Sequence, residues 1–106
     1  MAVEVSIDQL KQARQDGAFV VDVRNDDEYA AGHVTGATSL PLPDVEARMQ
    51  ELPQDQTVYL ICQGGGRSGK AADLLGAAGY DVLSVAGGTS AWIEAGGETT
   101  PGTERG

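Results

Sequence analysis

The chain has 106 residues, of which 41% are hydrophobic and 22% charged, and this fits one small globular domain and excludes a two-domain enzyme. Sixteen Asp and Glu residues against seven Lys and Arg residues give a formal net charge of −9, which argues against general binding of nucleic acid or an anionic membrane. One cysteine and one histidine cannot form an internal disulfide or a four-ligand zinc site, so we expect neither.

The N-terminal residues lack the basic start and the apolar core of a signal peptide. No stretch approaches the roughly 20 consecutive apolar residues that a membrane-spanning helix needs. We therefore expect a monomer in the cytoplasm, with its cysteine reduced.

The first half of the chain alternates between helix and strand signals. Ser6 and Gln9 match a capping box, which predicts a short helix that ends near Gly17. The apolar run over 18–23 then predicts a strand that is covered on both faces.

Residues 25–28 supply capping side chains and negative charge for a second helix, which should end at Gly32. A brief strand at 39–40 and a helix over 45–51 follow.

The second half continues the alternation, with strands predicted at 57–61 and 82–85 and helices at 70–78 and 89–95. This order predicts an α/β fold with a mainly parallel sheet. The last ten residues, 97–106, contain no apolar residue that could anchor them. We predict that they are disordered and that the folded domain covers residues 1–96.

The only cysteine lies where parallel α/β sheets place their sites. Cys62 follows the strand predicted over 57–61, and residues 63–68 (QGGGRS) join it to a helix. Three consecutive glycines allow the backbone to turn its N–H groups inward, which favours an anion. The helix N-terminus and Arg67 add positive charge, and no carboxylate lies between residues 56 and 72. We expect a locally positive loop that lowers the pKa of Cys62 and makes its thiolate a nucleophile without a general base.

Three other interpretations of this loop are open. Cys62 could be a buried apolar residue at a strand end, with the glycines as a permissive turn. Residues 64–71 approach the phosphate-binding motif G-x-x-x-x-G-K-[ST], but Ala71 lacks the hydroxyl that holds Mg²⁺. Cysteine-dependent phosphatases use C-x₅-R, whereas Cys62 and Arg67 form C-x₄-R. The smaller ring favours one sulfur atom over a phosphate.

Four motifs in register resemble the rhodanese family of sulfurtransferases. They are 22–24 (DVR), 28–41 (EYAAGHVTGATSLP), 62–68 (CQGGGRS), and 85–88 (VAGG) with the Ala-Trp pair at 91–92. The resemblance runs from about residue 19 to residue 96. It implies a rhodanese-like α/β fold with a mostly parallel five-stranded sheet and helices on both faces.

The resemblance implies an enzyme that moves sulfane sulfur through a persulfide on Cys62. The sulfur would come from a small donor, thiosulfate or a persulfide, and would pass to cyanide in an assay or to a cellular thiol on a small molecule or a protein. Arg67 would act with Cys62 in catalysis by positioning the anionic donor, and no metal or organic cofactor would take part. The residues implied to bind substrate are Gln63, Gly64, Gly65, Gly66, Arg67 and Ser68.

Four residues outside the loop are interpreted as structural support. Asp22, Arg24 and Glu28 could form an ion-paired scaffold beneath the loop, and His33 could fix a turn by hydrogen bonds. A second function stays open, namely a sulfur-carrier or regulatory rhodanese module whose partner supplies the donor and acceptor chemistry. An intact Cys62 argues against an inactive module but does not separate an enzyme from a carrier.

Overall fold

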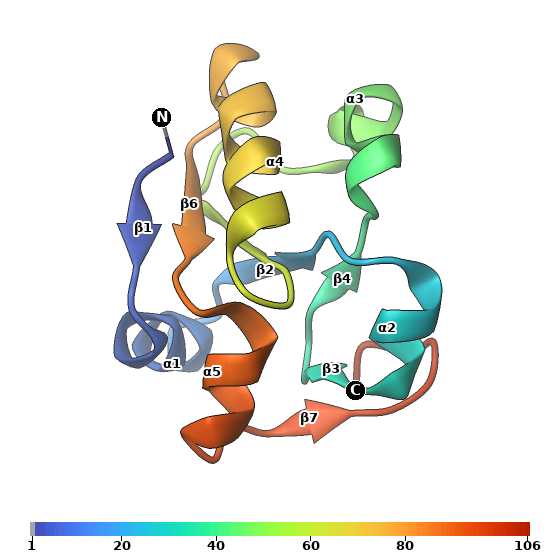
Figure 1. Cartoon of the computed structure of the whole chain (residues 1–106). Helices are drawn as coiled ribbons and strands as arrows, with labels where there is room; N and C mark the ends of the chain where they lie inside the picture. The colour runs from blue at the N-terminus through green and yellow to red at the C-terminus, as the bar shows by residue number, and fades with distance from the viewer. Residues whose placement is uncertain (1) are drawn as a thin grey trace.

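The predicted α/β alternation forms a single five-stranded sheet at the centre of the molecule (Figure 1). The computed structural model describes residues 2–106. In spatial order the strands are β1 (Glu4–Val5), β6 (Val82–Val85), β5 (Val58–Ile61), β2 (Phe19–Asp22) and β4 (Thr38–Ser39). Every neighbouring pair is parallel, so the predicted fold class is confirmed.

Short helices connect the strands. They are α1 (Ile7–Gln15), α2 (Asp26–Ala31), the 3₁₀ turn η1 (Leu42–Asp44), α3 (Val45–Arg48), the 3₁₀ turn η2 (Met49–Glu51), α4 (Gly66–Ala77) and α5 (Gly88–Glu94). The predicted capping box of α1 is confirmed, because the Gln9 N–H donates to Ser6 Oγ at 3.1 Å and the Ser6 N–H donates to Gln9 Oε1 at 2.7 Å. Helix α4 begins four residues earlier than predicted, because residues 66–69 of the glycine-rich segment form its first turn.

Two separate clusters of apolar side chains form the core, one on each face of the sheet. On β2, Val21 packs with residues of α3 and α4, while Val20 packs with residues of α1 and α5. On β5, Leu60 belongs to the cluster of Val21, and Ile61 belongs to the cluster of Val20. Successive residues of a strand point to opposite faces, so the apolar run of each strand serves both clusters.

The C-terminal segment differs from the prediction of disorder. Strand β7 (Thr99–Thr100) pairs antiparallel with β3 (His33–Val34), and together they form a second, two-stranded sheet. The carbonyl of Glu98 accepts a hydrogen bond from Trp92 Nε1 at 2.9 Å. Hydrogen bonds of backbone groups, and not apolar side chains, hold this segment against the domain. The absence of apolar residues therefore predicted disorder.

The end of the segment packs close to the only histidine. His33 is fully buried and stacks on the Tyr29 ring, with 3.6 Å between ring centroids. Its Nδ1 lies 2.8 Å from the Tyr29 carbonyl, and its Nε2 lies 3.3 Å from the Arg105 carbonyl. The Gly36 N–H also donates to the Arg105 carbonyl, at 2.7 Å. The partners of His33 therefore come from α2 and the C-terminal segment.

Within residues 2–106, no helix has the length and apolar character required to cross a membrane.

Removing residues 98–106 is expected to destabilise the domain. The truncation removes the pairing of β3 with β7 and the acceptors of the hydrogen bonds donated by Trp92 Nε1 and the Gly36 N–H. We expect a loss of about 2 kcal/mol, which corresponds to a decrease of roughly 8–16 °C in the midpoint of thermal unfolding for a domain of this size.

The matched control is Glu104→Gln, which changes an exposed residue of the same segment and should leave the midpoint unchanged. A truncated protein that unfolds at the temperature of the full chain would contradict the pairing of β3 with β7.

Candidate active site

The glycine-rich loop folds around the sulfur atom of Cys62. This residue follows β5 directly and is 1% exposed. The Gly65 N–H donates to Cys62 Sγ at 3.0 Å. Gly65 has a φ of +114° and is the N-cap of α4, so the chain turns back toward the sulfur at a position that strongly favours glycine. The prediction that this loop aims backbone donors at the cysteine is confirmed.

A second contact to the sulfur comes from the first turn of α4. The Cys62 thiol donates to Ser68 Oγ at 3.5 Å, and the Ser68 hydroxyl donates in turn to the Gly65 carbonyl at 3.1 Å. The same hydroxyl lies 2.7 Å from Ser84 Oγ on β6, and both serines are fully buried. Sequence analysis did not identify Ser84, although a serine inside the apolar run of β6 was the available signal.

The pKa of Cys62 reflects two opposing effects. Burial raises the pKa of the thiol, because it removes water from the charged form. Hydrogen bonds from the Ser68 side chain and from the backbone N–H groups of residues 68, 65 and 64 lower it. The net result is a lowered pKa, as predicted, and hydrogen bonds are the main effects that lower it.

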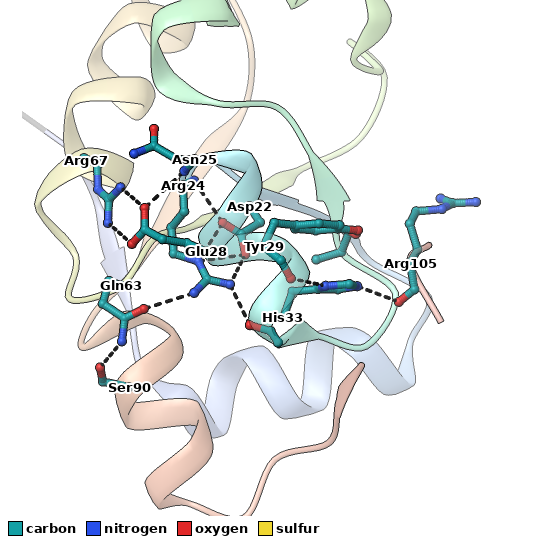
Figure 2. Close-up of polar contacts among 12 residues, drawn as sticks. Asp22, Arg24, Asn25, Glu28, Tyr29, His33, Gln63, Arg67, Ser90 and Arg105 are labelled. Atoms are coloured by element: carbon teal, nitrogen blue, oxygen red, sulfur yellow. Dashed lines mark hydrogen bonds and ion pairs between the residues drawn. The ribbon is translucent and has the colours of Figure 1, made fainter. Parts of the chain in front are cut away.

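Arg67 is paired with a carboxylate from another part of the chain (Figure 2). Its Nη1 donates to Glu28 Oε1 at 2.6 Å and its Nη2 donates to Glu28 Oε2 at 2.9 Å. The guanidinium outweighs partial burial and lowers the pKa of Glu28 to about 2. The positive charge that Arg67 was expected to give the loop is therefore offset, because α2 brings a carboxylate that lies 39 residues away in the sequence.

The other arginine of the region links β2 to the loop (Figure 2). Arg24 Nη2 donates to Asp22 Oδ2 at 2.8 Å, and both side chains are at least 96% buried. Arg24 Nη1 donates to Gln63 Oε1 at 3.0 Å, and Gln63 Nε2 donates to Ser90 Oγ on α5 at 2.7 Å. Asp22 and Arg24 thus form an ion-paired scaffold beside the loop, while Glu28 pairs with Arg67 instead of joining it.

The N-terminus of helix α5 contacts the backbone at the start of the loop. The Thr89 N–H donates to the Cys62 carbonyl at 2.8 Å, and the Ser90 N–H donates to the Gln63 carbonyl at 3.2 Å. A Cβ at Gly88 would lie 2.5 Å from the Cys62 carbonyl oxygen, so only glycine permits this approach. The role of the 85–88 motif is therefore to place the N-terminus of α5 against the active-site loop.

Across the described residues 2–106, no three His, Cys, Asp or Glu side chains are grouped as metal ligands.

Ser68→Ala is expected to raise the pKa of Cys62, because the variant loses the side-chain hydrogen bond that lowers it. Less thiolate then exists at neutral pH. Alkylation of Cys62 by iodoacetamide at pH 7 should be about threefold to tenfold slower, and the rates should converge at high pH where both thiols are ionised.

Ser39→Ala is the control for this experiment, since Ser39 lies on β4 and its Oγ has no hydrogen-bond partner among the described residues. An unchanged pH profile in Ser68→Ala would remove Ser68 from the stabilisation of the thiolate.

Gly88→Ala should displace α5 or the loop, because the added Cβ clashes with the Cys62 carbonyl and residue 88 has a φ of +58°. We expect a loss of about 2 kcal/mol or more in unfolding free energy and slower alkylation of Cys62. Gly69→Ala in α4 has open space and should be neutral or slightly stabilising. Equal stability of the two variants would contradict the close approach of α5.

Comparison with known proteins agrees with this geometry. Residues 6–95 match the sequence profile of the rhodanese-like domain. The chain is 37% identical over 89 residues to thiosulfate sulfurtransferase GlpE of Pseudomonas entomophila, covering 83% of this chain and 82% of the relative. It is 34% identical over 92 residues to YrkF of Bacillus subtilis, described as a candidate sulfur carrier protein, covering 84% of this chain and 50% of that one.

Among solved structures, a rhodanese-related protein from Thermoplasma volcanium superposes with a TM-score of 0.88 at 25% identity, covering 96% of this chain and 99% of the other. The chain spans 50–60% of the length of three of the curated relatives, YrkF among them.

Proposed function

The chain belongs to the rhodanese-like domain family, and from this premise we propose that it is a sulfurtransferase that carries sulfane sulfur as a persulfide on Cys62. The observation that carries the proposal is the set of donors around Cys62 Sγ, which lowers the pKa of the chain's only thiol inside a C-x₄-R loop. The similarity to a thiosulfate sulfurtransferase supports it.

The proposed reaction has two half-cycles. In the first, the Cys62 thiolate attacks the outer sulfur of a donor such as thiosulfate, a bond forms between Sγ and that sulfur, and the S–S bond of the donor breaks. The bonding electron pair leaves with sulfite. In the second, cyanide or a thiolate attacks the outer sulfur of the persulfide, and the Cys62 thiolate is regenerated. The N–H of Gly65 stabilises the thiolate, and the Ser68 hydroxyl, which accepts from the thiol in this structure, would rotate from the Gly65 carbonyl to donate to the thiolate.

Arg67 is proposed as the second catalytic residue, which contacts the anionic donor. Glu28 occupies two of the five N–H donors of its guanidinium, so further donors remain. The backbone of residues 63–68 would hold the donor and the transferred sulfur. The Gln63 side chain instead contacts Arg24 and Ser90, so we assign it to loop support.

A sulfur-carrier module is the second candidate function. The similarity to YrkF supports it, since this chain matches only half of that protein. In that case a partner would supply the donor and acceptor chemistry, and Cys62 would still carry the persulfide. We further propose that the protein is a cytoplasmic monomer with a thiol acceptor, small or protein-bound.

A mass measurement tests the persulfide directly. Reduced protein incubated with excess thiosulfate and desalted should contain a species heavier by one sulfur atom. Cyanide should then remove that atom and release an equal amount of thiocyanate. Because Cys62 is the only thiol, Cys62→Ser should show neither step.

The same experiment separates the two candidates. Loading from thiosulfate or a small persulfide supports the enzyme, whereas loading only from a protein persulfide supports the carrier. If no donor adds sulfur to Cys62, both functions are wrong.

A further inference from the structure

We propose that Glu28 sets the donor specificity of the Cys62 loop, so that the loop prefers an organic persulfide with at most one negative charge over the dianion thiosulfate. This inference rests on the proposed sulfur transfer and names its donor class.

The first argument is the charge balance beside the loop. Each of its two arginines has its own carboxylate, since Arg67 pairs with Glu28 and Arg24 pairs with Asp22. The four side chains together carry no net charge. Lys70 is the remaining cation in residues 62–70, and its exposed position on α4 leaves its charge screened by water. A dianion therefore meets a neutral site on a chain whose formal net charge is −9.

The second argument is the use of the backbone donors. The N–H of Gly65 already donates to Cys62 Sγ, and the N–H groups of residues 64 and 68 also stabilise its thiolate. Thiosulfate would bring three sulfonate oxygens that need donors of their own. A persulfide presents only its outer sulfur to the loop, which suits a ring that closes around one sulfur atom.

The third argument is the leaving group. When the Cys62 thiolate attacks the outer sulfur of a persulfide RS–SH, the new S–S bond forms on Sγ and the old S–S bond breaks. The electron pair leaves with RS⁻, and the proton stays on the new persulfide. A leaving thiolate carries one charge, whereas leaving sulfite carries two and depends more on a free cation.

Glu28 keeps its charge under all working conditions, because its pKa of about 2 lies far below neutral pH. The neutralisation of Arg67 is thus a fixed property of the site. Only a change of side chain removes it.

The test compares the wild type with Glu28→Gln and with Asp27→Asn as the matched control. Both variants remove one negative charge from the first turn of α2, but exposed Asp27 is not the partner of Arg67. Glutamine can still accept the capping hydrogen bond that the Asn25 N–H donates to Glu28 Oε1. Glu28→Ala serves as a second variant, with no acceptor for Arg67 at all.

The readout is kcat/KM for thiosulfate and for the persulfide of a small thiol, at one ionic strength. Glu28→Gln should raise kcat/KM for thiosulfate by about tenfold, mainly through a lower KM, and should change the value for the persulfide by less than about twofold. Asp27→Asn should change both by less than about twofold. An unchanged ratio between the two donors, or a fall in the thiosulfate value, would overturn the proposal and show that Glu28 orients Arg67 for the anion.

A binding measurement separates this inference from the proposed reaction. Sulfate should protect Cys62 from iodoacetamide, and about tenfold less sulfate should give half-protection in Glu28→Gln than in the wild type. If the sulfate concentration for half-protection shifts in this way but no donor adds sulfur to Cys62, the role of Glu28 is supported and sulfur transfer is refuted. No shift in half-protection would refute the role of Glu28.

Discussion

The hydrogen bonds made by one residue, Cys62, hold the whole site together. Its sulfur accepts from the Gly65 N–H at the start of α4, and its carbonyl accepts from the Thr89 N–H at the start of α5. Because Cys62 directly follows β5, a single position joins a central strand to the N-termini of two helices. The first N–H groups of a helix have no acceptor within the helix, and here the Cys62 sulfur and carbonyl accept from two of them.

The lowered pKa of the Cys62 thiol follows mainly from hydrogen bonds. Burial opposes ionisation of Cys62, yet the net shift of its pKa is downward, so the donors from the loop and from Ser68 outweigh the loss of water. A hydrogen bond to a charged group contributes about 1.5–3 kcal/mol, and several converge on this sulfur. Such donors are fixed by the backbone, so salt screens them far less than it would screen an exposed arginine.

The features that could be predicted from the sequence are those that neighbouring residues and the order of elements determine. The capping box of α1, the parallel sheet and the placement of Cys62 after a buried strand all follow from neighbouring residues. Sequence analysis did not find the Glu28–Arg67 pair or the contact of Ser84 with Ser68, because each joins segments that become neighbours only in the folded sheet. The C-terminal strand was missed for another reason, since main-chain hydrogen bonds leave no side-chain signature.

The two ion pairs of the region have different consequences because they differ in burial. Asp22 and Arg24 are nearly fully buried, and breaking such a pair would leave an uncompensated charge at a cost of about 3–5 kcal/mol. Arg67 and Glu28 are 34% and 30% exposed, and a solvent-exposed pair contributes only about 0–1 kcal/mol. Arg24 is thus a buried support for Gln63, whereas the Arg67–Glu28 pair is partly exposed to solvent. The charge that an approaching donor meets is therefore set at the exposed pair, by whichever side chain occupies position 28.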